Sequence, residues 1–543
     1  MTRLRIALAA TSIIALSFWI GASLHRVTQS PPSTTPSDVV EAALPNPEPQ
    51  IVETPEFSTI DEESAPNPMG ESNPSIPNEL LIAFADLDSF HAFAALAAAN
   101  DIRILDRSET LLSFRLAYEG QQAIERIGNL AGEDAEIDPN YIVVTPTFPE
   151  MPSNTGTRSF ENRALEWIGV TQDNRSWGQG VTIAILDTGI LDHPTLSEAS
   201  VSQIRMIEET EGASQDPYSS HGTSVASLIA GEGIGIAPSS SLIGIQVIED
   251  NGTGDSFTLA AGIVEAVDRG ASVISMSLGS YGSSAALQKA VNYALENDVA
   301  LIASAGNDSL GSLTYPARYE GVIGVTAVDS ESQPAYFSNF GSAADIAAPG
   351  VDLLAAWEQD QWASFSGTSA SAPLVAGSIA ALLSIESRLT PNAAANLILE
   401  YANDAGLPGP DPYLGSGALN IERVLQRNET GIADAALADI YLDVSDGESN
   451  ALPLLVNVEN RGTELLNSVS ISLQENDGFA QRIYLGSIPS NQTVTHTLYL
   501  SEAQLESGYS IQAETILGNQ SDDRTGNDAL VRQMRILPAN DRR

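Results

Sequence analysis

The 543-residue sequence contains no cysteine and a single lysine, Lys289. Without cysteine, the chain can form no disulfide, no thiolate metal site and no cysteine nucleophile. Its 24 basic residues face 70 acidic ones, which gives a formal net charge of −46 at pH 7. A surface so rich in carboxylates repels nucleic acid and anionic lipid headgroups, so we expect neither as a partner. A chain of this length can bury a large core, so the lack of disulfides does not exclude export.

The first 26 residues are typical of an export signal. Arg3 and Arg5 precede an apolar run from Ile6 to Leu24. The run is also long enough to span a membrane, so a cleaved signal peptide and an uncleaved anchor at residues 6–24 remain alternatives. In both cases we expect the rest of the chain outside the cytoplasm, secreted or periplasmic, with no membrane contact beyond this possible anchor. Residues 27–77 are rich in proline and acidic residues, which indicates a disordered linker.

Three folded regions are predicted after the linker. Residues 78–147 show a strand–helix–strand–strand–helix–strand pattern, the order of a small ferredoxin-like α+β module. Over residues 160–428, short β-rich runs alternate with small-residue helices, which predicts a doubly wound parallel α/β sheet. In residues 433–538 helical patterns give way to strands separated by Gly, Asn and Ser turns, which predicts a β-sandwich. The expected strands of the α/β region are Val181–Leu186, Leu242–Val247, Val273–Met276, Ala300–Ala303 and Val322–Ala327.

Three polar residues stand at the ends of elements in the α/β region. Asp187 ends a buried strand, and His221 and Ser369 head two small-residue helices. A serine hydroxyl needs a base to become a nucleophile, and the base needs a partner that orients it. His221 can serve as that base and Asp187 as its partner. Asn307 follows another strand and can donate its side-chain amide to an oxyanion, together with the main-chain N–H of Ser369.

The motifs around these residues resemble those of subtilisin-like serine proteases, in the same chain order. They are Asp187-Thr-Gly189, His221-Gly-Thr223, Ser275-Met-Ser-Leu-Gly279, Ala305-Gly-Asn307 and Gly367-Thr-Ser369-Ala-Ser-Ala-Pro373. The resemblance covers about residues 160–427. It implies a serine endopeptidase that acts on polypeptides through an acyl-enzyme intermediate on Ser369. It also implies that the module at 78–147 is a propeptide, a transient inhibitor that the enzyme cuts off between Val143 and Asn162.

The resemblance also implies where a peptide substrate binds. It implies that Ser277, Leu278 and Gly279 form an exposed strand that pairs with an extended peptide. Walls of the pocket for the residue before the scissile bond are implied for Ala303-Ser-Ala305, Gly306 and Thr314-Tyr315. None of these wall positions is acidic, so we expect a preference for apolar or mid-sized residues there. No cofactor is implied. The stretch Gly231–Pro238 is shorter than the calcium-holding loop of many subtilisins, so no Ca²⁺ site is assigned, although structural Ca²⁺ elsewhere stays possible.

Several features also have plainer interpretations. His193 lies in a His-Pro turn, where we favour a structural role over that of the catalytic base. Asp250–Asp255 is interpreted as a solvated, turn-rich loop near the cleft, not as a ligand site. An esterase would show Gly-x-Ser-x-Gly, but position 371 is Ser. A non-catalytic adhesion protein is the other alternative, suggested by the linker and the β-rich C-terminal region.

Overall fold

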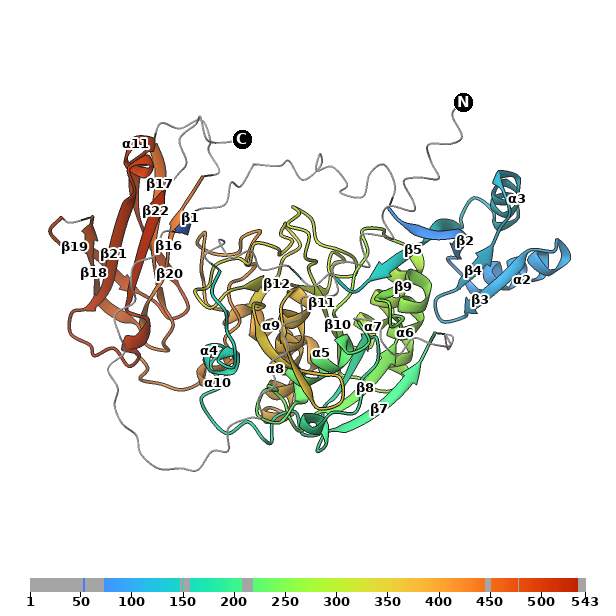
Figure 1. Cartoon of the computed structure of the whole chain (residues 1–543), viewed down its shortest axis with the longest axis horizontal. Coiled ribbons are helices and arrows are strands. Elements are labelled where there is room, and N and C mark those ends of the chain that lie inside the picture. The colour runs from blue at the N-terminus through green and yellow to red at the C-terminus, as the bar shows by residue number, and fades with distance from the viewer. Residues whose placement is uncertain are drawn as a thin grey trace.

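The structure, a computed structural model, describes residues 52–53, 73–146, 149, 157–207, 218–444, 451–476 and 478–535. The predicted export segment and most of the linker lie outside these residues. The described parts form three bodies in a row (Figure 1). An N-terminal module (residues 75–144) lies at one end, a central α/β domain in the middle, and a β-sandwich at the other end.

The N-terminal module is a sheet covered by two helices. Its elements are β2 (Ser75–Ala83), α2 (Leu87–Ala99), β3 (Arg103–Ser108), β4 (Ser113–Ala117), α3 (Gln121–Ala131) and β5 (Glu136–Val144). Helix α2 begins at Leu87, and Asp86 caps it by accepting from the Ser89 N–H. Phenylalanines fill the core, with the rings of Phe90 and Phe114 stacked 4.3 Å apart. These contacts give a small module a core of its own.

The central domain confirms the predicted doubly wound parallel sheet. Seven strands lie in the order β13-β12-β11-β10-β6-β8-β7. The five predicted strands are present as β6 (Thr182–Asp187), β8 (Ser241–Gln246), β10 (Val273–Met276), β11 (Ala300–Ser304) and β12 (Val322–Val328). The prediction omitted both edge strands, β7 (Ser200–Arg205) and β13 (Ile346–Pro349). Strand β7 is mostly exposed and polar, so it lacks the apolar run by which the other strands were found.

Helices cover both faces of this sheet, and alternate residues of β6 point into two separate cores. Ile183 and Ile185 pack with α5 (His221–Ala230) and α8 (Thr368–Ile385). Ala184 and Leu186 pack on the other side, with α6 (Ser256–Asp268) and α7 (Ala285–Glu296). All ten residues of α5 are buried. Among the described helices only α8 is long and apolar enough to span a membrane, and most of it is buried inside the domain, as in a core helix.

The remaining elements of the central domain frame its ends. They are α4 (Ala164–Trp167), the 3₁₀ turn Pro194–Leu196, β9 (Thr253–Asp255), the hairpin β14 (Leu353–Trp357) and β15 (Gln361–Phe365), α9 (Pro391–Glu400) and α10 (Ile421–Gln426). Strand β9 corrects the interpretation of Asp250–Asp255 as a solvated loop, because it pairs with β5 of the N-terminal module. Backbone pairing by short polar residues carries no hydrophobic pattern, so the sequence showed only a turn-rich stretch.

The C-terminal domain is a sandwich of two sheets. One contains β16 (Ala435–Leu442), β17 (Ala451–Asn460) and β20 (Thr493–Ser501). The other contains β18 (Leu466–Glu475), β19 (Gln481–Ile488), β21 (Tyr509–Leu517) and β22 (Ala529–Arg535), with β1 (Val52–Glu53) beside β22. Helix α11 (Glu502–Glu506) and the 3₁₀ turn Thr525–Asn527 connect strands. Aliphatic side chains from both sheets form one core.

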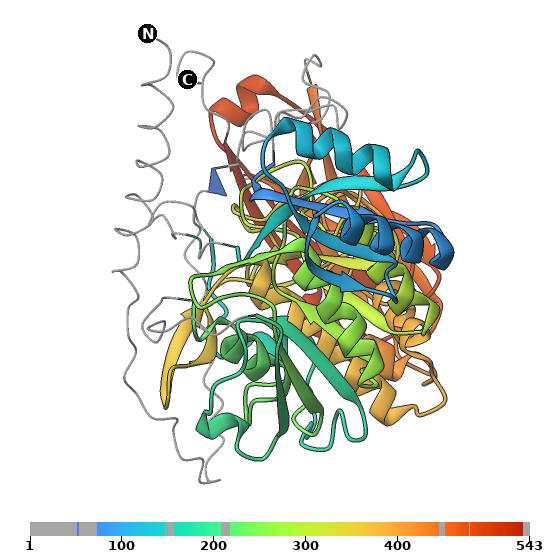
Figure 2. The same cartoon turned by 90° about the vertical axis from the view of Figure 1, so that its right-hand side faces the viewer.

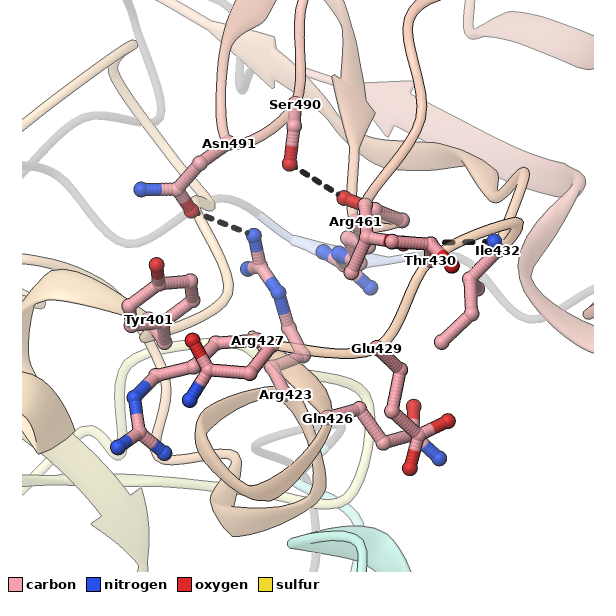
Figure 3. A pocket seen from close by; sticks show the side chains of 13 residues that line it. Tyr401, Arg423, Gln426, Arg427, Glu429, Thr430, Ile432, Arg461, Ser490 and Asn491 are labelled. Carbon is pink, nitrogen blue, oxygen red and sulfur yellow. Dashed lines mark hydrogen bonds between the residues drawn. The ribbon is translucent and has the colours of Figure 1, made fainter.

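The sandwich is joined to the central domain through polar groups. Arg423 of α10 donates to Glu459 Oε1 at 2.6 Å and to Asn491 Oδ1 at 2.7 Å. Figure 3 shows Arg423 reaching from its helix toward Asn491, beside a cavity of about 270 Å³ between the two domains. Arg461 binds the same glutamate, because its Nε donates to Glu459 Oε2 at 2.8 Å. The junction is therefore a buried ion-pair network.

Candidate active site

Asp187 and His221 meet at the carboxyl end of the central strand β6. Asp187 is the last residue of β6 and His221 the first of α5. His221 Nδ1 lies 2.8 Å from Asp187 Oδ1 and 2.9 Å from Oδ2, and neither residue is exposed. A neutral imidazole that donates through Nδ1 has its acceptor lone pair on Nε2, the atom that a general base uses.

The turns that carry these two residues are fitted to one another. The Gly222 N–H donates to Thr188 Oγ1 at 3.1 Å, and the Thr188 N–H donates to Asp187 Oδ1 at 2.7 Å. A Cβ on Gly222 would lie 2.2 Å from the carbonyl oxygen of Gly189, which is too close for any side chain. The glycines and threonines of Asp187-Thr-Gly189 and His221-Gly-Thr223 therefore hold the carboxylate against the imidazole.

Ser369 is the second residue of α8 and is 2% exposed. The ring of Phe365, at the end of β15, packs edge-on against His221 with centroids 5.4 Å apart, which brings the start of α8 next to the histidine. In the described part of the chain, Ser369 Oγ has no hydrogen-bond partner. The structure thus joins Asp187 to His221 directly and places the serine helix beside them, without a formed Ser369–His221 hydrogen bond.

Pro373 lies in the second turn of α8. It has no N–H, so the Ser369 carbonyl receives no helical hydrogen bond from position 373. The hydroxyl of Ser277 donates to that carbonyl instead, at 3.1 Å. The side chain of Ser277 therefore positions the serine helix, whereas its predicted role in substrate binding would fall to its backbone.

Asn307 lies against the loop that leads into α8. Its Oδ1 accepts hydrogen bonds from Thr368 N and Thr368 Oγ1, both at 2.9 Å. A Cβ on Gly367 would come within 2.7 Å of Asn307 Nδ2, so this glycine leaves room for the amide. Thr368 fixes which end of the amide faces the serine. In the sequence this threonine is only part of a motif, and no local pattern reveals its contact with Asn307.

A strand of the N-terminal module occupies the groove between two segments of the central domain. Val143 and Val144 of β5 pair with Gly254 and Thr253 of β9. On the other side, Val144 N donates to Gly279 O at 2.9 Å and Gly279 N donates to Val144 O at 2.8 Å. Gly279 therefore pairs with an extended segment in the way predicted for a peptide substrate, here a segment of the same chain.

The other predicted substrate-binding residues lie around Thr314. Its side chain fills the space between Gly279 and Gly306, because Cβ atoms built on these glycines would fall 2.2 Å from Thr314 Oγ1 and 3.2 Å from Thr314 Cγ2. Thr314 N donates to Ala305 O at 3.0 Å. The side chains of Leu278 and Ala305 are buried in the core, so these residues could contact a peptide only through their backbone.

Asp308, an acidic group next to these segments, is not among the predicted site residues. It directly follows Asn307, and its Oδ2 accepts a hydrogen bond of 2.6 Å from the hydroxyl of Tyr281. Burial and this carboxylate raise the pKa of Tyr281. The carboxylate is thus engaged with a neighbouring side chain of the domain.

His193 has a structural position. Its Nδ1 accepts from Thr195 N at 3.2 Å, and Nε2 lies 3.0 Å from Gln361 O. Burial lowers the pKa of His193, which favours the neutral ring. With both nitrogens engaged by backbone groups, His193 caps the turn Pro194–Leu196.

No group of three or more His, Asp or Glu side chains that could hold a metal ion occurs among the residues that the structure describes. At the shortened stretch Gly231–Pro238, Glu232 N donates to Thr195 O at 2.8 Å and Thr195 Oγ1 donates to Glu232 O at 3.1 Å. The loop and the turn after His193 are thus joined directly by hydrogen bonds.

Comparison with known proteins agrees with this geometry. The subtilase (peptidase S8) family model matches residues 178–417. The chain is 32% identical over 363 residues to M-protease of Shouchella clausii, an alignment that covers 63% of this chain and 90% of that protein. It is 35% identical over 292 residues to a thermostable alkaline protease of Halalkalibacterium halodurans, covering 52% of this chain and 75% of that one. The chain therefore belongs to the subtilase family of serine proteases.

The fold likeness extends beyond the central domain. The crystal structure of fervidolysin from Fervidobacterium pennivorans, described as a keratinolytic enzyme related to subtilisin, aligns with 88% of this chain and 95% of its own. The TM-score is 0.55 and the sequence identity 19%. At this identity the match concerns the fold alone.

Proposed function

We propose that the chain is an exported serine endopeptidase with Asp187, His221 and Ser369 as its catalytic triad. The observation that carries the proposal is the Asp187–His221 contact, buried beside the start of the helix that bears Ser369. His221 Nε2 takes the proton of Ser369 Oγ as this oxygen attacks the substrate carbonyl, and then returns it to the leaving amine. Water hydrolyses the resulting ester by the same steps. Asp187 orients the imidazole and stabilises its charged form.

The oxyanion that forms during attack needs hydrogen-bond donors already in place. Asn307 Nδ2 is such a donor, because Thr368 holds the other end of the amide. The main-chain N–H of Ser369, in the first turn of α8, is a second donor. No cofactor is required for these steps.

The test is covalent labelling of the mature enzyme with a peptidyl phosphonate. We expect a single adduct at Ser369, found by mass spectrometry of the digested protein, and none in Ser369→Ala. The adhesion-protein alternative predicts no adduct in either protein. Labelling at another serine would overturn the assignment of the nucleophile.

The N-terminal module serves, in this proposal, as a propeptide that blocks the cleft. Besides the pairing of β5, its side chains complete the starts of two helices of the central domain. Asp138 Oδ2 accepts from Ala285 N of α7 at 2.8 Å, and Asn140 Oδ1 accepts from Phe257 N of α6 at 3.2 Å. Arg115 of the module pairs with Asp255, the N-cap of α6, at 3.2 Å. In Figure 2 the module lies in front of the central domain.

Self-processing of this pro-form is testable with the nucleophile removed. Ser369→Ala, expressed without other proteases, should accumulate as a full-length pro-form in which the module stays bound. The wild type should release a mature form. Cleavage of Ser369→Ala at the wild-type junction would show that another protease performs the processing.

Export follows, in this proposal, from residues 1–26, and places the enzyme outside the cytoplasm with polypeptides as substrates. Edman sequencing of the Ser369→Ala pro-form and immunoblotting of membrane and soluble fractions separate a cleaved signal from an anchor at residues 6–24. For the residue before the scissile bond we propose an apolar side chain of modest size, because Thr314 fills space between Gly279 and Gly306. Faster cutting after Arg than after Leu in matched chromogenic peptides would contradict this preference.

A further inference from the structure

Strand β5 ends at Val144, two residues before Pro146. Val144 and Gly279 exchange both main-chain hydrogen bonds, so they form a hydrogen-bonded antiparallel pair. Continuing this register by two residues places Pro146 opposite Ser277. The Ser277 side chain contacts the carbonyl of Ser369. Position 146 is therefore the residue that the cleft presents to Ser369.

We propose that Pro146 makes the pro-segment an inhibitor that the enzyme does not cut at the bond where it lies. The inference rests on the proposed peptidase function. In an antiparallel ladder, hydrogen-bonded pairs recur every second residue, so a residue at position 146 would donate its N–H to Ser277 O. Proline has no N–H to donate, and its ring fixes φ near −65°, away from extended strand geometry.

The missing bond bears on the chemical step. Cleavage would require Ser369 Oγ to attack the carbonyl carbon of residue 146 while its proton passes to His221, and the proton then to the departing amine of residue 147. Without the hydrogen bond from position 146 to Ser277 O, the carbonyl of residue 146 is held less firmly in the cleft. A loosely held carbonyl is poorly aligned for the attack, and alignment contributes strongly to the rate. The segment therefore occupies the cleft with little turnover.

The register that presents Pro146 is fixed by contacts earlier in the strand. The side chain of Val143 is fully buried in a core of the central domain, whereas that of Val144 is 36% exposed. A slip of one residue would exchange these two faces and expose Val143. Thr145 N donates to Gly252 O at 3.0 Å, and the buried Asn140 binds Asp255 and Phe257. These contacts fix the register of residues 140–145 while the module stays bound.

The inference is tested by Pro146→Leu in the full-length chain, with wild type and the double variant Pro146→Leu/Ser369→Ala as controls. We expect Pro146→Leu to be cut after residue 146 at least tenfold faster than the wild type, as seen by intact-mass spectrometry of timed samples. The double variant should stay uncut. A wild-type fragment that ends at Pro146 and forms as fast as the variant's fragment would overturn the inference.

Two synthetic peptides spanning residues 137–150, with Pro or Leu at position 146, make the test independent of folding of the variant. Against mature enzyme, the Pro peptide should inhibit hydrolysis of a chromogenic substrate without being cut, and the Leu peptide should be cut after position 146. Equal cutting of both peptides after position 146 would reject the role of Pro146 while leaving the peptidase function standing. Mature enzyme that cuts neither the Leu peptide nor any chromogenic substrate would reject both.

Discussion

The hydroxyl of Ser277 donates a 3.1 Å hydrogen bond to the main-chain carbonyl of Ser369, the carbonyl that Pro373 leaves without a helical donor. A proline inside a helix normally costs stability because a backbone acceptor loses its partner. Here the acceptor belongs to the candidate nucleophile, and the replacement donor comes from the segment Ser277–Gly279, whose last residue pairs with β5 of the N-terminal module. The side-chain donor that replaces the backbone donor therefore ties the start of α8 to this segment.

Ser277→Ala should leave this buried carbonyl unsatisfied and loosen the position of Ser369. We expect a loss of about 1–3 kcal/mol in the free energy of unfolding, together with a fall in kcat and little change in KM. Adding Pro373→Ala restores a main-chain N–H at position 373 and should recover most of both losses. Urea unfolding in the Ser369→Ala background and steady-state kinetics in the active enzyme measure the two effects. Unchanged kcat and stability in Ser277→Ala would show that the hydrogen bond has no positioning role.

The variant Asn307→Asp tests the oxygen and nitrogen ends of the Asn307 amide separately. The aspartate keeps an oxygen for Thr368 but loses the N–H that would stabilise the oxyanion. We expect kcat to fall about 10²–10³-fold with KM nearly unchanged, a magnitude known from loss of the equivalent donor in subtilisin itself. In Asn307→Ala, kcat should fall at least as far, and the protein should also lose stability, because Thr368 loses its hydrogen-bond acceptor. A variant Asn307→Asp with wild-type kcat would remove Asn307 from the mechanism.

Thr314→Gly should open the space between Gly279 and Gly306. With the side chain removed, a larger substrate residue before the scissile bond can enter the pocket. The ratio of kcat/KM for Phe to that for Ala at this substrate position should therefore rise about tenfold. A rise of this size corresponds to roughly 1–2 kcal/mol of new apolar burial. Thr314→Ser, which removes only the methyl group, is the matched control and should shift the ratio by a smaller amount. A ratio that stays constant in both variants would place the pocket elsewhere.

Removal of calcium should leave the stretch Gly231–Pro238 in place, because Thr195 and Glu232 bond to each other directly. Thermal unfolding of the Ser369→Ala pro-form in excess chelator and in millimolar Ca²⁺ should give the same Tm at matched ionic strength. A structural ion present at one hundred times its Kd would add about 2.7 kcal/mol, which such a scan readily detects. A clear rise of Tm with Ca²⁺ would reveal a calcium site elsewhere in the protein.

The sequence was sufficient for the central sheet, and it placed the candidate site residues at strand and helix ends, because both features depend on local patterns. Buried parallel strands have continuous apolar runs, and the Asp187, His221 and Asn307 motifs stand directly at strand or helix ends. The edge strand β7 and the cleft strand β9 were missed, since their residues are polar and their pairing is made by backbone. The partnership of Ser277 with the Ser369 carbonyl joins positions 92 residues apart in the chain. No pattern in one sequence specifies such a contact.

Glu459 should prove essential for docking the β-sandwich onto the central domain. It accepts from Arg423 and from Arg461, and the side chains of Arg423 and Glu459 are only 2% and 3% exposed. Figure 3 shows both arginines at this junction.

Glu459→Gln removes the shared counter-charge and leaves two guanidinium groups near one another. We therefore expect a loss of about 3–5 kcal/mol in the free energy of unfolding, the usual cost of breaking a buried pair from one side. Removing Arg423 as well, as Arg423→Met/Glu459→Gln, should cost less than the sum of the single changes, because the most deeply buried cation is then gone together with its partner. Urea unfolding in the Ser369→Ala background, followed by Trp fluorescence, measures these differences. Strictly additive losses would mean that the two side chains do not depend on each other and that the sandwich is held by its other contacts.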